Sequence, residues 1–161
     1  MTKAEGGFNL FDAWAGHADP RRAQIARGQE VFNSVNPSHK SCIVCHDSVN
    51  NGTNISNDLF DIRTTSVDAR TPDLPLYTFR NKKTGETRQL TDAGFGNVTG
   101  KWDDLGLFKT PTLRGLAARA PYFHNGIAAT LKDVVTHYEA ALGFQFTPQE
   151  RADLVAFMEA L

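Results

Sequence analysis

The sequence predicts an all-α domain with long loops and one small β-hairpin between its helices. Three stretches of the 161-residue chain carry helix signals, one near the start and two near the end. Between them, residues 47–110 hold turn signals and prolines that interrupt any long regular element. We therefore expect residues 19–161 to form one domain with a loop and hairpin insertion at about 47–110, preceded by an N-terminal extension over residues 1–18.

The first helix is expected to begin at Pro20. Asp19 precedes this proline, and an aspartate N-cap followed by proline at the first helical position is a common helix start. Small or apolar residues then recur at spacings of 3, 4 and 3, which places them on one helical face: Ile25, Gly28, Phe32 and Val35. A glycine inside a helix costs about 1 kcal/mol relative to alanine. Gly28 therefore indicates that another helix crosses closely at that point.

The last helix is expected to begin at Pro148 and to be the one that crosses the first helix. Thr147 provides an N-cap, and Glu150 stands where it can complete a capping box. The apolar stripe of this helix consists of Leu154, Phe157 or Met158, and Leu161.

Two further elements complete the expected fold. A helix begins near Thr130, with Asp133 three residues on, and ends near Gly143. The hairpin pairs residues 76–80 with residues 87–90 across a loop that contains glycine.

The segment Cys42-Ile43-Val44-Cys45-His46 carries the most specific chemical signal in the chain. Two cysteines separated by two residues and followed at once by histidine form the attachment motif of a c-type haem. Residues three apart share one face of a helical turn, so both thiols can bond to one porphyrin. We predict one haem c, held covalently by Cys42 and Cys45, with His46 as a ligand of the iron.

Three other uses of this motif agree less well with the sequence. A structural zinc site needs two more ligands at short spacing, and no such pair occurs among His17, His39, His124 and His137. A thioredoxin-type redox pair needs a βαβ setting, which the sequence does not predict. A plain disulfide gives no reason for the adjoining histidine.

The order of these parts resembles known haem proteins. A glycine-containing first helix that crosses a C-terminal helix, with CxxCH soon after it, resembles the class I cytochrome c fold. Residues 108–138 resemble the C-terminal half of the bacterial di-haem cytochrome c peroxidase and MauG family. The matching stretches are Lys109-Thr110-Pro111-Thr112-Leu113-Arg114, Ala120-Pro121-Tyr122-Phe123-His124-Asn125-Gly126 and Thr130-Leu131-Lys132-Asp133-Val134-Val135. The resemblance covers about residues 20–161 and is loosest in the middle loops.

The resemblance implies that Tyr138 is the second iron ligand. In the family this ligand lies about fourteen residues after the histidine that matches His124, and it is methionine in peroxidases and tyrosine in MauG-like members. Tyr138 could instead be a core tyrosine with a hydrogen-bonded hydroxyl. Met158 is an alternative ligand, although its place in the apolar stripe favours core packing. His137 points about 100° away from Tyr138 on a helix, so we expect it at the surface.

The resemblance also places His124 and Arg114 near the haem. His124 is a candidate distal ligand, a catalytic group that moves a proton during peroxide cleavage, or a structural residue of its loop. Arg114 is expected to pair with a haem propionate, because a guanidinium matches a carboxylate. Arg119 is a second candidate for this pairing, and solvation at the surface is the alternative for both arginines.

Composition and targeting signals limit location and partners. The net charge is −1, from 17 Lys and Arg against 18 Asp and Glu, which favours neither nucleic acid nor an anionic membrane surface. The sequence has no apolar run long enough to span a membrane and no signal peptide at its start. Haem attachment to CxxCH normally occurs outside the bacterial cytoplasm, so we expect an exported, periplasmic protein.

Two functions follow from the motif and the resemblance. The first is electron transfer by a mono-haem c-type cytochrome domain, with a redox partner protein or an adjoining haem domain. The second is a peroxidase or MauG-like oxidation at an open or Tyr-ligated iron, with hydrogen peroxide as the oxidant. Family enzymes have two haems, whereas this chain has one CxxCH motif, so the sequence leaves enzyme activity undecided.

Overall fold

The computed structural model describes residues 20–35, 41–47 and 53–161, and its regular structure is mainly helical. The longer helices are α2 (Pro20–Asn33), α4 (Leu131–Leu142) and α5 (Pro148–Met158), and α3 (Gly96–Thr99) is a single turn. Turns of 3₁₀ helix lie at Cys42–Val44 (η1), Val67–Ala69 (η2), Trp102–Asp104 (η3) and Leu116–Ala118 (η4). The expected extension over residues 1–18, together with Asp19, His17 and His39, lies outside the described residues.

Two small antiparallel sheets accompany the helices within the described ranges. β2 (Tyr77–Arg80) and β3 (Thr87–Leu90) form the hairpin that the sequence predicts. β1 (Leu59–Phe60) pairs with β4 (Phe108–Lys109), which the sequence did not predict. Each strand has only two residues, and the two strands lie almost fifty positions apart. Alternation of apolar and polar residues cannot be recognised in so short a run, so the sequence does not indicate this pair. The fold is helical with two small sheets, and the expected all-α class is not confirmed.

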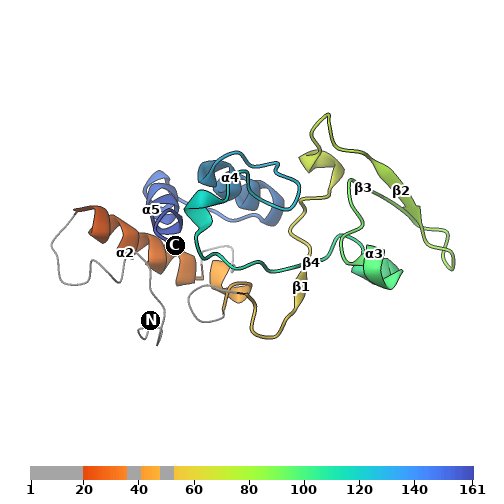
Figure 1. Ribbon diagram of the computed structural model, residues 1–161, viewed down its shortest axis with the longest axis horizontal. Helices are drawn as coiled ribbons and strands as arrows, with labels where there is room; N and C mark the ends of the chain where they lie inside the picture. The colour runs from red at the N-terminus through yellow and green to blue at the C-terminus, as the bar shows by residue number, and fades with distance from the viewer. Residues whose placement is uncertain (1–19, 36–40, 48–52) are drawn as a thin grey trace.

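The elements separate into two ends joined by extended chain (Figure 1). Helices α2, α4 and α5 gather at one end, and the β2–β3 hairpin lies with α3 at the other. The short strands β1 and β4 run between these ends. Among the described residues, no helix has the length and apolar character needed to cross a membrane.

Gly28 is the point where α2 and α5 cross, as the sequence predicts. A Cβ atom at this position would lie 1.9 Å from the carbonyl oxygen of Asp153 and 2.7 Å from Cβ of Phe157. Only a residue without a side chain permits this approach. Beside the crossing, Arg27 Nε donates to Asp153 Oδ2 at 2.8 Å, and Arg21 forms an ion pair with Glu159.

The helix ends in the last third of the chain also agree with the sequence. Thr130 and Asp133 form a capping box at the start of α4, and Gly143 ends that helix with a φ of 70°. Thr147 and Glu150 form a second capping box at the start of α5. Both predicted helix starts and the predicted end at Gly143 are confirmed. They could be predicted because the residues that form a helix cap are close together in the sequence.

The hydrophobic core lies between α2, α4 and α5. Its buried members include Ile25, Phe32, Leu131, Val135, Leu154, Phe157 and Met158. The rings of Phe32 and Phe157 are 5.5 Å apart between centroids. Val35 was expected on the buried face of the first helix, and this is wrong: α2 ends at Asn33, and Val35 is 66% exposed.

Candidate functional site

The CxxCH motif forms a tight turn directly after the first helix. At the end of η1, the backbone N–H groups of Cys45 and His46 both donate to the carbonyl oxygen of Cys42, each at 3.2 Å. The hydroxyl of Ser41, a buried residue, donates to the carbonyl oxygen of Phe32 at 3.3 Å, which ties the turn to the end of α2. The two cysteines are free thiols, half-buried and three residues apart on one turn.

Both thiols are held in surroundings that favour their neutral form. Burial raises the pKa of Cys42 to about 12, and the neighbouring thiol of Cys45 adds to this rise. Burial also raises the pKa of Cys45, with a further contribution from Asp47. Redox-active CxxC pairs depend instead on a lowered thiol pKa. The raised pKa values of Cys42 and Cys45 therefore argue against a thioredoxin-type redox pair.

Tyr138 faces the same interior as the two thiols. Burial is the main cause that raises the pKa of its hydroxyl, and Cys42 and Cys45 are the next two causes. The phenol on α4 contacts Phe123, which packs against the same core cluster as Cys42. The rings of Phe123 and Phe144 pack against it edge-on, at 5.8 and 6.0 Å between centroids.

His46 and Met158 lie against the crossing of α2 and α5. His46 is half-buried, and its ring centroid is 6.2 Å from that of Phe32. Met158 is 6% exposed and belongs to the core cluster with Leu154 and Phe157. The thioether of Met158 is thus surrounded by core side chains.

His124 makes its contacts with a different part of the chain. Its ring stacks on Phe108 at 4.2 Å, and its Nε2 lies 3.9 Å from Oδ2 of Asp92. Burial lowers the pKa of His124, and the Asp92 carboxylate opposes this effect. The preceding residue, Phe123, has a φ of 65° and faces Tyr138 instead. These two neighbouring rings therefore contact different parts of the structure.

His137 is not at the surface, so that expectation is wrong. The side chain is half-buried, with Nε2 2.8 Å from the carbonyl oxygen of Ile62 and the ring 4.7 Å from that of Phe123. The segment around Ile62 covers this face of α4. A contact between residues 75 positions apart cannot be read from helical periodicity.

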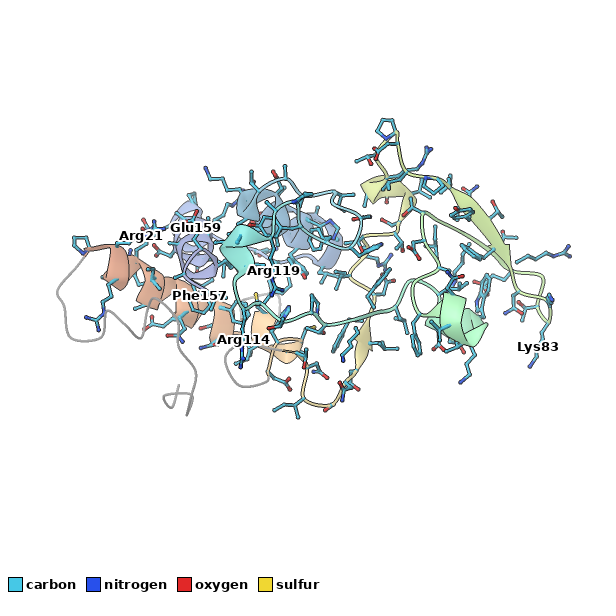
Figure 2. The ribbon with its side chains drawn as sticks, viewed as in Figure 1. Arg21, Lys83, Arg114, Arg119, Phe157 and Glu159 are labelled. Atoms are coloured by element: carbon cyan, nitrogen blue, oxygen red, sulfur yellow. The ribbon has the colours of Figure 1, made fainter. Side chains whose placement is uncertain are left out.

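Arg114 and Arg119 lie near the helical end of the molecule, whereas Lys83 marks the far hairpin end (Figure 2). Arg114 is exposed, and its backbone N–H donates to Oγ1 of Thr112 at 3.3 Å. Arg119 Nη1 donates to the carbonyl oxygen of Thr112 at 3.2 Å. Both guanidinium groups come from the loop that joins β4 to α4.

Sequence reasoning missed several side chains that surround the candidate groups. Phe123 and Phe144 pack on Tyr138, and Asp92 lies beside His124. None of these contacts follows from a local sequence motif. Phe123 directly precedes His124, but the direction of its side chain depends on its positive φ, which the sequence does not indicate.

The donor set of this site fits a c-type haem. Two unbridged thiols share one turn, an imidazole follows at once, and a half-buried tyrosine contacts Phe123, which packs on the same core as Cys42. Aromatic and apolar side chains surround these groups, as a porphyrin requires. Such surroundings favour the neutral thiols. Thiols are the groups that become thioethers when a c-type haem is attached.

Comparisons with known proteins give the site a context. No protein-family model matches the chain. The chain is 32% identical over 172 residues to the cytochrome-c peroxidase IdrP1 of Denitromonas iodatirespirans, covering 94% of this chain and 44% of that protein. It is 29% identical over 164 residues to the methylamine utilization protein MauG of Methylophilus methylotrophus, covering 94% of this chain and 41% of that protein.

A solved structure supports the fold. It is that of a MauG-like protein associated with microbial copper homeostasis, which matches with a TM-score of 0.56 at 24% identity, over 92% of this chain and 45% of that one. The chain thus spans less than half the length of the proteins it matches. It is related to the bacterial cytochrome c peroxidase and MauG family over nearly its whole length.

Proposed function

We propose that this chain is a mono-haem c-type cytochrome domain that transfers electrons through one covalently bound haem. The observation that supports this most is the arrangement of Tyr138 and the CxxCH turn. Cys42 and Phe123 pack against the same core, and the ring of Phe123 lies 5.8 Å from that of Tyr138, although the sequence separates Cys42 from Tyr138 by more than ninety positions. A phenol and a CxxCH turn that share one interior suit the two faces of one haem.

In this proposal four residues hold the haem. Cys42 and Cys45 would attach it through thioether bonds, and His46 and Tyr138 would supply ligands to the iron. When bound, the haem supplies a one-electron couple between ferric and ferrous iron. Burial opposes ionisation of the Tyr138 hydroxyl in the chain alone, so a positive ion beside it is needed to displace its proton. A phenolate ligand favours ferric iron and gives a low reduction potential.

The domain boundaries, the role of Arg114, the location and the partner are proposed from the same resemblance. Residues 19–161 form a class I cytochrome c-like domain with its insertion at about 47–110, and Arg114 binds a haem propionate. The protein acts in the periplasm after export, because CxxCH maturation takes place there. Its partner is a redox protein or an adjoining haem domain.

The alternative is an enzyme that reduces hydrogen peroxide or carries out a MauG-like oxidation. The names of the relatives favour it, since they include cytochrome c peroxidases and MauG. His124 would then hold a proton at Nε2, with the nearby Asp92 carboxylate to stabilise the charged imidazole.

Haem attachment is tested first. The chain is expressed with a c-type maturation system, and haem is quantified per chain before and after treatment with acidic acetone. We expect one haem that stays with the protein, and loss of covalent attachment in a Cys42→Ala, Cys45→Ala double variant. Val44→Ala, at an exposed position between them, is the matched control. A colourless product, or pigment that acidic acetone extracts from the wild type, would contradict the proposal.

Peroxide turnover then separates the two functions. The holoprotein is mixed with hydrogen peroxide and a reduced one-electron donor, and donor oxidation is compared with that by free haem. Reversible one-electron reduction without peroxide turnover supports the electron carrier. Turnover well above the free-haem rate, reduced in His124→Gln, establishes the alternative.

A further inference from the structure

An open cavity lies between the hairpin and the loop that carries His124, apart from the CxxCH turn. Its volume is about 510 Å³, within the range of small-molecule sites. One wall is apolar and aromatic, with Leu74, Pro75, Tyr77 and Phe79. Asp92 and His124 also line the cavity. The cavity thus combines apolar and aromatic side chains with the ionisable pair Asp92 and His124, and Thr91, Ala93, Asn97 and Asn125 complete its lining.

The two polar groups are spaced for one shared partner. His124 Nε2 and Asp92 Oδ2 lie 3.9 Å apart, which is too far for a good hydrogen bond. A single oxygen atom can lie about 2.8 Å from both. A hydroxyl there would donate its proton to the carboxylate and accept the N–H of His124, in the tautomer protonated on Nε2. Both polar groups would then be satisfied by one group of the ligand.

Neighbouring contacts fix both groups in place. The backbone N–H of Gly94 donates to Oδ1 of Asp92 at 2.6 Å, which leaves Oδ2 directed at His124. The imidazole ring is stacked on Phe108 with an angle of 26° between the planes. A site whose polar groups are already oriented loses little entropy when a ligand binds.

Charge and exposure restrict the class of ligand. Of the described residues that line the cavity, none is lysine or arginine, and Asp92 is the acidic one, so an anion is repelled. Burial lowers the pKa of His124, which favours the neutral ring that can donate one proton and accept another. Tyr77 is 52% exposed, so an aromatic face is open to a planar ligand.

We propose that this cavity binds a small, uncharged aromatic molecule that carries a hydroxyl group, of the phenol class. The hydroxyl lies between His124 and Asp92, and the ring lies against Tyr77 and Phe79. A hydroxyl satisfies both groups when His124 carries its proton on Nε2; an ammonium ligand would need the other tautomer, and benzylamine tests that case below. The proposal concerns binding alone and goes beyond the electron transfer proposed above.

Titration of the ¹⁵N-labelled, reduced holoprotein with phenol tests this site by NMR. We expect the amide signals of Ala93 and Asn125, which line the cavity, to shift with a dissociation constant on the order of 1 mM. Toluene lacks the hydroxyl, benzoate is an anion and benzylamine is a cation, so each should bind about tenfold more weakly than phenol.

Variants locate the hydroxyl. Asp92→Asn keeps an oxygen for the Gly94 N–H, and His124→Phe keeps the stacking on Phe108, so both preserve the surrounding packing. Each should weaken phenol binding about tenfold, whereas Asp103→Asn, at an exposed position outside the cavity, should not. The proposal is overturned if toluene or benzylamine binds as well as phenol. It is also overturned if both variants bind phenol normally, or if these signals do not move at 10-fold the expected constant.

Discussion

At the scale of single residues, Tyr138 has the most constrained surroundings in the candidate site. Its hydroxyl is buried near two thiols, and its ring contacts the rings of Phe123, His137 and Phe144. Such surroundings hold a phenol neutral and leave its ring little freedom to turn. In the proposed holoprotein, the iron is the positive charge that offsets this cost.

Replacement of Tyr138 should change the iron directly. We expect Tyr138→Phe to convert the ferric spectrum to that of an iron lacking an oxygen ligand. Tyr138→Met should raise the reduction potential by a fraction of the roughly 0.8 V that haem axial ligands span, since a thioether favours ferrous iron. Visible and EPR spectra with a potentiometric titration measure both effects. Tyr122→Phe, at a buried tyrosine of the core, is the control, and an unchanged spectrum in Tyr138→Phe would exclude ligation by this residue.

Single residues also show where the sequence was informative. The CxxCH motif could be identified because its spacing is a chemical requirement within five adjacent positions. His137 was misplaced, and the Asp92–His124 pair was not foreseen, because both depend on loops that return from distant positions. The direction of Phe123 was equally hidden, since its φ of 65° is rare for a residue with a side chain.

At the scale of elements, the crossing of α2 and α5 organises the helical end. Its close approach removes all space for a side chain at position 28. The sequence predicted this contact. Glycine lowers the stability of a helix, so a glycine on an apolar helical face indicates a neighbour that leaves no room for a side chain. The β1–β4 pair was missed, because two-residue strands have no periodicity to detect.

Gly28→Ala separates two opposing effects at this crossing. Helix propensity alone would stabilise the variant by about 1 kcal/mol, whereas overlap with the backbone of Asp153 should destabilise it by about 3 kcal/mol or more. We expect the overlap to dominate in urea unfolding. Ala23→Gly, at an exposed position on α2, should cost only the propensity term. A Gly28→Ala variant as stable as the wild type would refute the close crossing.

The capping box of α5 gives a second prediction for an element. The backbone N–H of Glu150 donates to Oγ1 of Thr147 at 3.2 Å. Thr147→Ala removes this acceptor from the first turn of α5. The free energy of unfolding should fall by about 1 kcal/mol. Thr147→Ser keeps the hydroxyl and should restore most of it, and equal losses in the two variants would assign the effect to the lost methyl group.

At the scale of the whole molecule, α2 and α5 join distant parts of the chain through a charged pair. Asp153 is 2% exposed and accepts two hydrogen bonds from Arg27, at 2.8 and 3.0 Å. Hydrogen bonding by Arg27 lowers the pKa of Asp153, and a hydrogen bond from Gln149 also lowers it, while burial opposes both. Folding therefore favours the ionised carboxylate.

Acid should weaken the fold through this carboxylate. Because the folded pKa is lowered, the stability from the pair is complete above the unfolded value of about 3.9 and is lost as the pH falls through the folded value. Urea unfolding between pH 7 and pH 2 measures it. Asp153→Asn should flatten the decline below pH 4, whereas the exposed Asp103→Asn should not. Equal slopes for the wild type and Asp153→Asn would disprove the linkage.

The contact of Arg27 with Asp153 spans 126 positions, so the chain between them is one large closed loop. The hairpin turn around Lys83 lies at the end of the molecule far from this contact (Figure 2). A single break of the backbone at that exposed lysine, made by expressing the chain as two fragments, should leave two pieces that elute together in gel filtration. The piece with α2 would carry the haem colour and still hold the piece with α4 and α5. Strong denaturant would part them, and its removal would let the pair reassemble.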